Sequence, residues 1–165
     1  MKSFVLSLMA VVAMCAMVSC AGGDSIEGKW KVDDASLKKL MGNDASMGKV
    51  DATVDIQADK AIATINMKTE GEMKMDMTLE ANLDYTKTDK DVTVTPKEVK
   101  LVKLDLPESL LKMAKESGMS EEKMKEEFAK EFTSKKPEPA TLSYTLADGK
   151  LTLKDEKDEI VLVRE

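Results

Sequence analysis

Strict alternation of apolar and polar residues is the strongest pattern in this chain, and it is clearest between residues 73 and 85. The apolar side chains at every second position there are Met73, Met75, Met77, Leu79, Ala81, Leu83 and Tyr85. A period of two places these side chains on one face of a β-strand and the polar residues on the other. We therefore predict a long, half-buried antiparallel strand, which must bend because it exceeds the usual five or six residues.

The same alternation recurs along the chain and predicts about eight strands in total. The other strands are expected at residues 26–32, 50–56, 61–68, 92–106, 142–146, 151–153 and 160–163. Asp148-Gly149 is a strong hairpin signal, and Pro96 indicates a bulge or an edge position because it has no backbone N–H. Eight antiparallel strands commonly close into an up-and-down barrel. The predicted fold class is all-β with a helical insert, arranged as a barrel or a strongly curved sheet.

Helical spacing replaces the alternation in two segments. Asp34 is expected to cap a short helix that ends at Gly42. Residues 107–135 form the predicted helical insert, in which Gly118 separates two helices and Ser120 caps the second. Because the insert is amphipathic, three roles are open for it: a helix pair packed on the barrel, a lid that controls ligand access, or a surface for a protein partner.

The start of the chain follows a different pattern. A lysine precedes an apolar run of 15 residues at positions 4–18, which is shorter than the roughly 20 residues of a transmembrane helix. The run closes with Met17-Val18-Ser19-Cys20, which resembles the lipobox of a bacterial lipoprotein signal peptide. The resemblance implies that residues 1–19 are a signal peptide, that residues 20–25 are a lipidated tether, and that residues 26–165 are the folded domain.

This resemblance also implies a location and a partner. Acyl chains on Cys20 would hold the protein at a membrane of the bacterial cell envelope. Ala21 follows the lipidated cysteine, and no Asp stands there as an inner-membrane retention signal, so the sorting rule of enteric bacteria favours the outer membrane. Cys15 lies in the removed segment, so the mature domain has no disulfide and must be stable through burial and hydrogen bonding alone.

Composition excludes several classes of function. The net charge of −6 is dispersed, with lysines and carboxylates alternating as on a solvated surface. No basic patch with interleaved aromatic residues exists, so we expect no nucleic-acid partner. The chain has no histidine, which removes histidine-based acid–base catalysis and serine triads. No calcium-loop or phosphate-loop motif is present either. We therefore expect no enzymatic activity and no cofactor.

The two ends of the predicted domain carry a second resemblance. Gly28-Lys29-Trp30 resembles the G-x-W signature on the first strand of lipocalins and fatty-acid-binding proteins. Arg164 is the sole arginine, and it lies on the last predicted strand. The resemblance implies that Arg164 packs over Trp30, the sole tryptophan, where the barrel closes, because arginine stacks well on an indole face. Gly28, Trp30 and Arg164 are thus the expected closure residues of a lipocalin-like (calycin-type) barrel. The chain departs from lipocalins in the place of its helices and in lacking their middle motif.

Three thioethers at period two, those of Met73, Met75 and Met77, form the sharpest chemical cluster in the sequence. Met67 on the preceding strand is positioned to join them. Three interpretations remain open: adaptable core filling, the lining of a flexible apolar cavity, and a soft-metal site for Cu(I). No histidine or free cysteine assists the third, so we assign no metal ligands.

These observations lead to one leading hypothesis and two alternatives. The first is a membrane-anchored lipoprotein that binds a small apolar ligand, such as a fatty acyl chain, inside the barrel. The residues expected to line the site are Trp30, Met73, Met75, Met77, Leu79 and Tyr144. The alternative is a non-enzymatic envelope protein with a filled core that docks a protein partner. The third hypothesis is Cu(I) binding by the methionine row.

Overall fold

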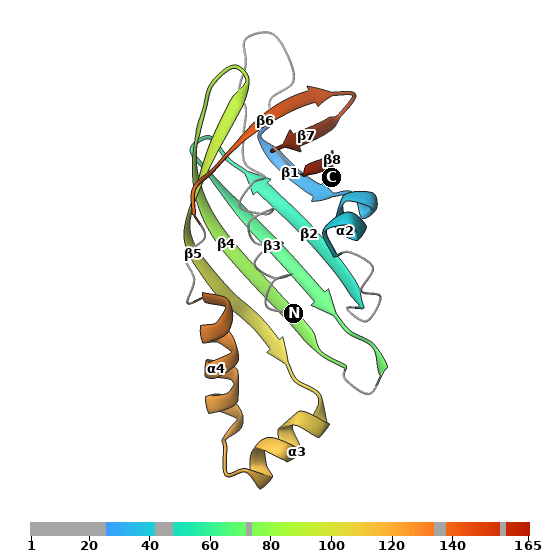
Figure 1. Ribbon diagram of the computed structural model, residues 1–165, viewed down its shortest axis with the longest axis vertical. Helices are drawn as coiled ribbons and strands as arrows, with labels where there is room; N and C mark the ends of the chain where they lie inside the picture. Colours follow the sequence, from blue (N-terminus) through green and yellow to red (C-terminus); the bar gives the residue numbers. More distant parts are fainter. Residues whose placement is uncertain (1–25, 42–47, 72–73, 134–137, 156–157) are drawn as a thin grey trace.

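A closed antiparallel barrel of eight strands forms the body of the protein (Figure 1). The computed structural model describes residues 26–41, 48–71, 74–133, 138–155 and 158–165. Each strand pairs with its neighbours in the sequence, and β1 pairs with β8. The strands are β1 (Gly28–Val32), β2 (Lys49–Ile56), β3 (Lys60–Lys68), β4 (Asp76–Lys87), β5 (Asp91–Asp105), β6 (Ala140–Ala147), β7 (Lys150–Lys154) and β8 (Glu159–Arg164). The predicted fold class is confirmed.

Three helices complete the described structure. Helix α2 (Asp34–Met41) connects β1 to β2, while α3 (Glu108–Glu116) and α4 (Glu121–Thr133) lie between β5 and β6. In Figure 1, α3 hangs below the end of β5 and α4 runs back beside that strand. None of the described helices has the length and apolarity needed to cross a lipid bilayer. Cys20, the proposed signal peptide and the tether lie outside the described residues.

The helix caps follow local side-chain chemistry. The Asp33 carboxylate accepts a hydrogen bond from the Ser36 backbone N–H at 2.7 Å, so Asp33 caps α2 and the prediction of Asp34 was wrong by one residue. The Val161 N–H donates to the Ser36 hydroxyl at 2.9 Å, which ties α2 to β8. Before α4, the Lys123 N–H donates to the Ser120 hydroxyl at 3.2 Å, which confirms Ser120 as a cap.

The ring of eight paired strands is complete over only part of the barrel, because the strands differ in length, and we call the end where β2 to β5 run past the other strands the open end. Only Asp91–Val94 of β5 pair with β6, and only Thr53–Ile56 of β2 pair with β1. The remaining parts of β2 to β5 continue as a four-stranded sheet, with which no further strand of the described residues pairs. We call this sheet the extension; it comprises residues 49–52, 65–68, 76–79 and 101–105. Helices α3 and α4 follow directly from its last strand (Figure 1).

Strand β5 stays in register with β4 through two bulges. Leu83 pairs with Pro96 and Asn82 with Glu98, so Lys97 is an extra residue. Val102 is extra in the same way, because Leu79 pairs with Leu101 and Thr78 pairs with Lys103. The predicted bulge at Pro96 is confirmed. Bulges add bend and twist to a strand, which suits one of 15 residues in a small barrel.

The long methionine-rich strand begins later than predicted. Strand β4 starts at Asp76, so Met75 precedes it, and Met73 lies outside the described residues. Met75 still continues the pairing with β3, because its N–H donates to the Thr69 hydroxyl at 2.8 Å and its carbonyl accepts from the Thr69 N–H at 2.9 Å. At the other end of β4, the Tyr85 hydroxyl donates to the carbonyl of Gln57 at 2.6 Å and anchors the β2–β3 turn.

Candidate functional site

The closed part of the barrel is a packed core. Trp30, Val32, Leu151 and Leu162 are each 0% exposed, so no water-sized space touches their side chains. The Trp30 indole N–H donates to the Ile26 carbonyl at 2.6 Å, which satisfies its single polar group. Trp30 is therefore a structural residue of the closed part. A ligand at that position would have to displace well-packed side chains.

The three expected closure residues come together between the first and last strands. Trp30 pairs with Arg164 across β1 and β8, and the guanidinium carbon of Arg164 lies 5.0 Å from the centre of the indole ring. Gly28 lies two residues before Trp30 on β1, opposite Ile56 of β2. The cationic guanidinium over the ring face is a stabilising arrangement that also covers the buried tryptophan.

Tyr144 lies at the end of the barrel opposite the methionines. Its hydroxyl donates to the carbonyl of Asp89 at 2.9 Å, in the turn between β4 and β5. Met75 directly precedes β4 and Met77 is its second residue, whereas this turn follows the last residue of β4. The structure therefore does not bring Tyr144 or Trp30 together with Met75 and Met77 in one lining.

The inner face of the extension is where the methionines gather. Met67 of β3 lies directly opposite Met77 of β4, and Met77 in turn pairs with Leu104 of β5. The next pairs along are Ile65 with Leu79 and Leu79 with Leu101. The residues that face inward here are Val50, Ala52, Ile65, Met67, Met77, Leu79, Leu101 and Leu104. This face is apolar throughout.

Sequence reasoning missed the contribution of β5 to this face. Leu101 and Leu104 are three residues apart, which breaks the period of two, and the bulge at Val102 explains the break. An odd spacing between apolar residues of one long strand was the signal that could have located them. Val99 and Leu101 are half-buried and Met75 packs against the core, so the rim of the inner face is its least covered part.

The helical insert follows the open end. Helix α4 packs against β5, and Phe128 on α4 is half-buried against the core. Ala114 is the buried residue of α3, while Met113 on the same helix is 64% exposed. The insert thus packs against β5 with part of its apolar face, and it leaves the Met113 side chain in solvent.

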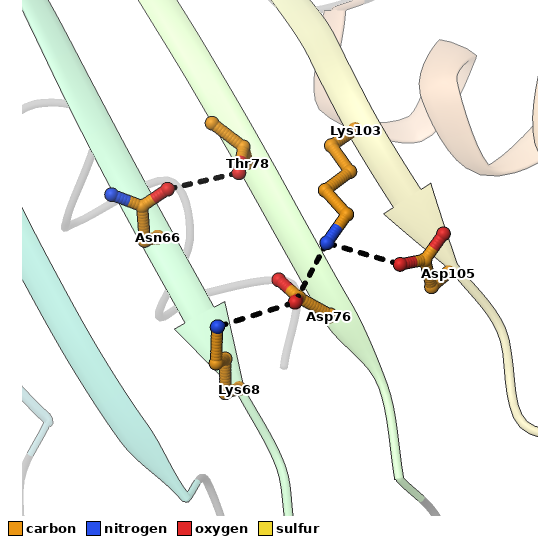
Figure 2. Close-up of polar contacts among 6 residues, drawn as sticks. All are labelled: Asn66, Lys68, Asp76, Thr78, Lys103 and Asp105. Carbon is orange, nitrogen blue, oxygen red and sulfur yellow. Dashed lines mark hydrogen bonds and ion pairs between the residues drawn. The ribbon is translucent and has the colours of Figure 1, made fainter.

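The outer face of the extension is polar and carries a hollow of about 410 Å³. Figure 2 shows the network at its edge: the Asp76 carboxylate lies 2.8 Å from the Lys103 ammonium and 3.4 Å from that of Lys68. Lys103 also pairs with Asp105 at 3.1 Å. The hydrogen bond from Lys103 holds the pKa of Asp76 below its ordinary value, and the same bond raises the pKa of Lys103.

No protein-family model matches this sequence, and no curated protein shows significant similarity to it. Within the described residues, no group of three or more histidine, cysteine, aspartate or glutamate side chains is arranged to hold a metal ion. The candidate sites are therefore those of the barrel itself: the apolar inner face and the polar outer face of the extension.

Proposed function

We propose that this protein is a lipid-anchored barrel of the bacterial cell envelope that binds a small apolar ligand, such as a fatty acyl chain, on the inner face of the extension. The observation that carries the proposal is an apolar face, rich in methionine, that continues beyond the closed ring of strands. Each methylene buried there contributes about 0.8 kcal/mol. The role is binding rather than catalysis, because the described side chains of this face offer no acid, base or nucleophile.

The insert supports this site by its position. Helix α4 lies along β5, whose inward residues Val99 and Leu101 are half-buried. Met67 and Met77 are only 6% and 1% exposed, so a ligand would enter past the half-buried Val99 and Leu101, between β5 and the insert, and would displace the side chains that cover the two methionines. Unbranched thioether side chains adapt their shape readily, so these methionines suit a flexible acyl chain.

The start of β1 lies at the end of the barrel away from the extension, which favours an open end that faces away from the membrane. Gly28 pairs with Ile56, the last residue of β2, whereas the extension begins with Lys49, the first residue of that strand. The lipid proposed on Cys20 would therefore attach near the closed end, through a tether of at most about 17 Å. A ligand would reach the open end from the aqueous side.

The first test is native mass spectrometry of the full-length protein, purified from bacteria in mild detergent without denaturant. A bound mass in the fatty-acid range supports the proposal. A copper-sized increment would instead favour the methionine row as a Cu(I) site. A bare lipoprotein mass, unchanged after addition of fatty acids and Cu(I), would overturn both and favour a protein partner.

A matched pair of variants locates the ligand. Met77→Gln places an amide on the inner face, and Met113→Gln makes the same change on an exposed surface of α3. An acyl chain offers the glutamine amide no hydrogen-bond partner, and the apolar contact of the thioether is lost, so Met77→Gln is expected to weaken binding of a fluorescent fatty acid about tenfold or more. Met113→Gln should leave it unchanged. Equal affinities in both variants would exclude the inner face.

A conservative variant separates the two ligand classes and guards against misfolding. Met77→Leu keeps the apolar volume and removes the thioether, so fatty-acid binding should persist while any Cu(I) binding falls. Loss of fatty-acid binding in a folded Met77→Leu variant would contradict the proposed mechanism of apolar burial. Circular dichroism of each variant checks that the barrel has formed.

A further inference from the structure

The polar outer face of the extension has no part in the proposed binding of an apolar ligand, because its side chains point away from the inner face. Two rows of side chains cross it from β2 to β5. The first row is Lys49, Lys68, Asp76 and Asp105, and the second is Asp51, Asn66, Thr78 and Lys103. Seven of these eight residues, all except Asp105, line the hollow of about 410 Å³ together with Lys31.

The first row brings two like charges together. Lys49 lies directly opposite Lys68 in the register of β2 and β3. Like charges in this position destabilise a sheet. The Asp76 carboxylate lies 3.4 Å from the Lys68 ammonium and offsets its charge. Asp76 is on β4, however, and Lys49 is on β2, so the two flank Lys68 on opposite sides. Within the described residues, no carboxylate lies in ion-pair range of the Lys49 ammonium, which leaves this charge for an external anion.

The second row adds a hydrogen-bond donor beside these lysines. The Thr78 hydroxyl donates to the Asn66 side-chain oxygen at 2.9 Å, which fixes the orientation of the amide. Figure 2 shows the Asn66 nitrogen on the side away from Thr78, toward β2. Lys31 and Asp51 pair with each other at 2.6 Å on the same side of the hollow. The Asp51 carboxylate provides acceptors for hydroxyl groups of a ligand.

We propose that this hollow binds the phosphate monoester of a small polar molecule, with the phosphate between Lys49 and Lys68 and against the Asn66 amide. A phosphate monoester carries close to two negative charges and three acceptor oxygens, which matches two ammonium groups and one amide donor. Lysine binds phosphate as a point charge. The hollow lies in the range of roughly 300–1,000 Å³ for small-molecule sites, so it has room for more than a bare phosphate.

The source of the phosphate follows from the position of the hollow. It lies at the end of β2 opposite the pairing of Gly28, and thus away from the proposed membrane anchor. A soluble phosphate ester fits this position better than a lipid headgroup of the same membrane. The overall charge of −6 does not prevent binding, because salt screens charges beyond about 8 Å.

The test is isothermal titration calorimetry of the full-length protein in non-ionic detergent with glycerol 3-phosphate. Glycerol is the neutral control, and dihexanoyl phosphatidic acid presents the same phosphate on a lipid. Lys49→Gln is the test variant, since it breaks none of the described ion pairs. Lys100→Gln is the matched control on the outer face of β5, where Lys100 pairs with Glu98 at 2.9 Å, outside the hollow.

Glycerol 3-phosphate should bind and glycerol should not. Lys49→Gln should weaken binding about fivefold, the equivalent of about 1 kcal/mol for an exposed ion pair, while Lys100→Gln should have no effect. Phosphatidic acid binding more than tenfold tighter than glycerol 3-phosphate would identify a lipid as the source of the phosphate. Absence of binding to both phosphates, or equal losses in both variants, would overturn the proposal. Neither result depends on the inner face, so the apolar-ligand proposal is tested separately.

Discussion

The approach of β2 to β3 at the start of the extension can be tested at Gly48. Its φ is +70°, and a Cβ built there would lie 2.7 Å from the Thr69 Cα and closer still to the Lys68 carbonyl oxygen. These neighbours are backbone atoms, which cannot rotate away. Gly48→Ala therefore requires both a left-handed alanine and a displacement of one strand from the other, at the point where the inner and outer faces of the extension begin.

The left-handed alanine and the displaced strand each lower the free energy of unfolding, and the two losses can be estimated separately. A residue with a Cβ in the left-handed region costs about 1–2 kcal/mol, and a forced backbone shift from overpacking costs about 1–3 kcal/mol more. Gly149 provides the control, because its φ is +69° but no atom lies within 4 Å of the Cβ position. Gly149→Ala should therefore cost only about 1–2 kcal/mol.

Urea denaturation followed by Trp30 fluorescence measures both free energies of unfolding by linear extrapolation. Gly48→Ala is expected to lose about 1–3 kcal/mol more than Gly149→Ala. Equal losses would mean that the strands do not approach so closely at this point. The description of the extension as a tightly paired sheet would then be wrong at its first residues.

Three further predictions concern the core and the surface network. Trp30→Phe leaves a buried backbone carbonyl without its donor and weakens the arginine contact, so the free energy of unfolding should fall by about 2–4 kcal/mol in urea denaturation; a loss below 1 kcal/mol would contradict the packed closure. Leu153→Ala in the closed core should cost about 2–5 kcal/mol, whereas Val102→Ala, at a residue 59% exposed, should change stability by less than about 0.5 kcal/mol. Because Lys103 lowers the pKa of Asp76 in the folded state, this ion pair stabilises the fold above the ordinary carboxyl value of 3.8 and loses that effect as the pH falls below it. The difference in Tm between wild type and Asp76→Asn should therefore shrink in acid, and a constant difference from pH 7 to pH 2 would refute the assignment.

The strand pattern was readable from the sequence because burial on one face imposes a period of two. The hairpin at Asp148-Gly149, the cap at Ser120 and the bulge at Pro96 were readable for the same local reason, since each depends on the backbone chemistry of one or two residues. These local signals were sufficient for the number of strands and their order.

The two candidate sites on the extension were less predictable, because they depend on which strands extend past the others. Alternation shows that Met77 and Tyr144 both face inward, but not that they lie at opposite ends of the barrel. Pairing register decides that, and register is a long-range property. The opposition of Lys49 and Lys68 is of the same kind, since nothing in either strand alone indicates its partner across the sheet.

The bulges of β5 have a consequence for insertions and deletions. Within a regular strand, loss of one residue turns every later side chain to the opposite face. Loss of Lys97 or Val102 would not turn the later side chains. Each is the extra residue of a bulge, and without it the residues on either side would alternate as in a regular strand. Deletion of Lys97 or Val102 would therefore shorten β5 by one residue while its other side chains keep facing the core or the solvent as they do now. Elsewhere in β5, the same deletion would put charged residues into the core.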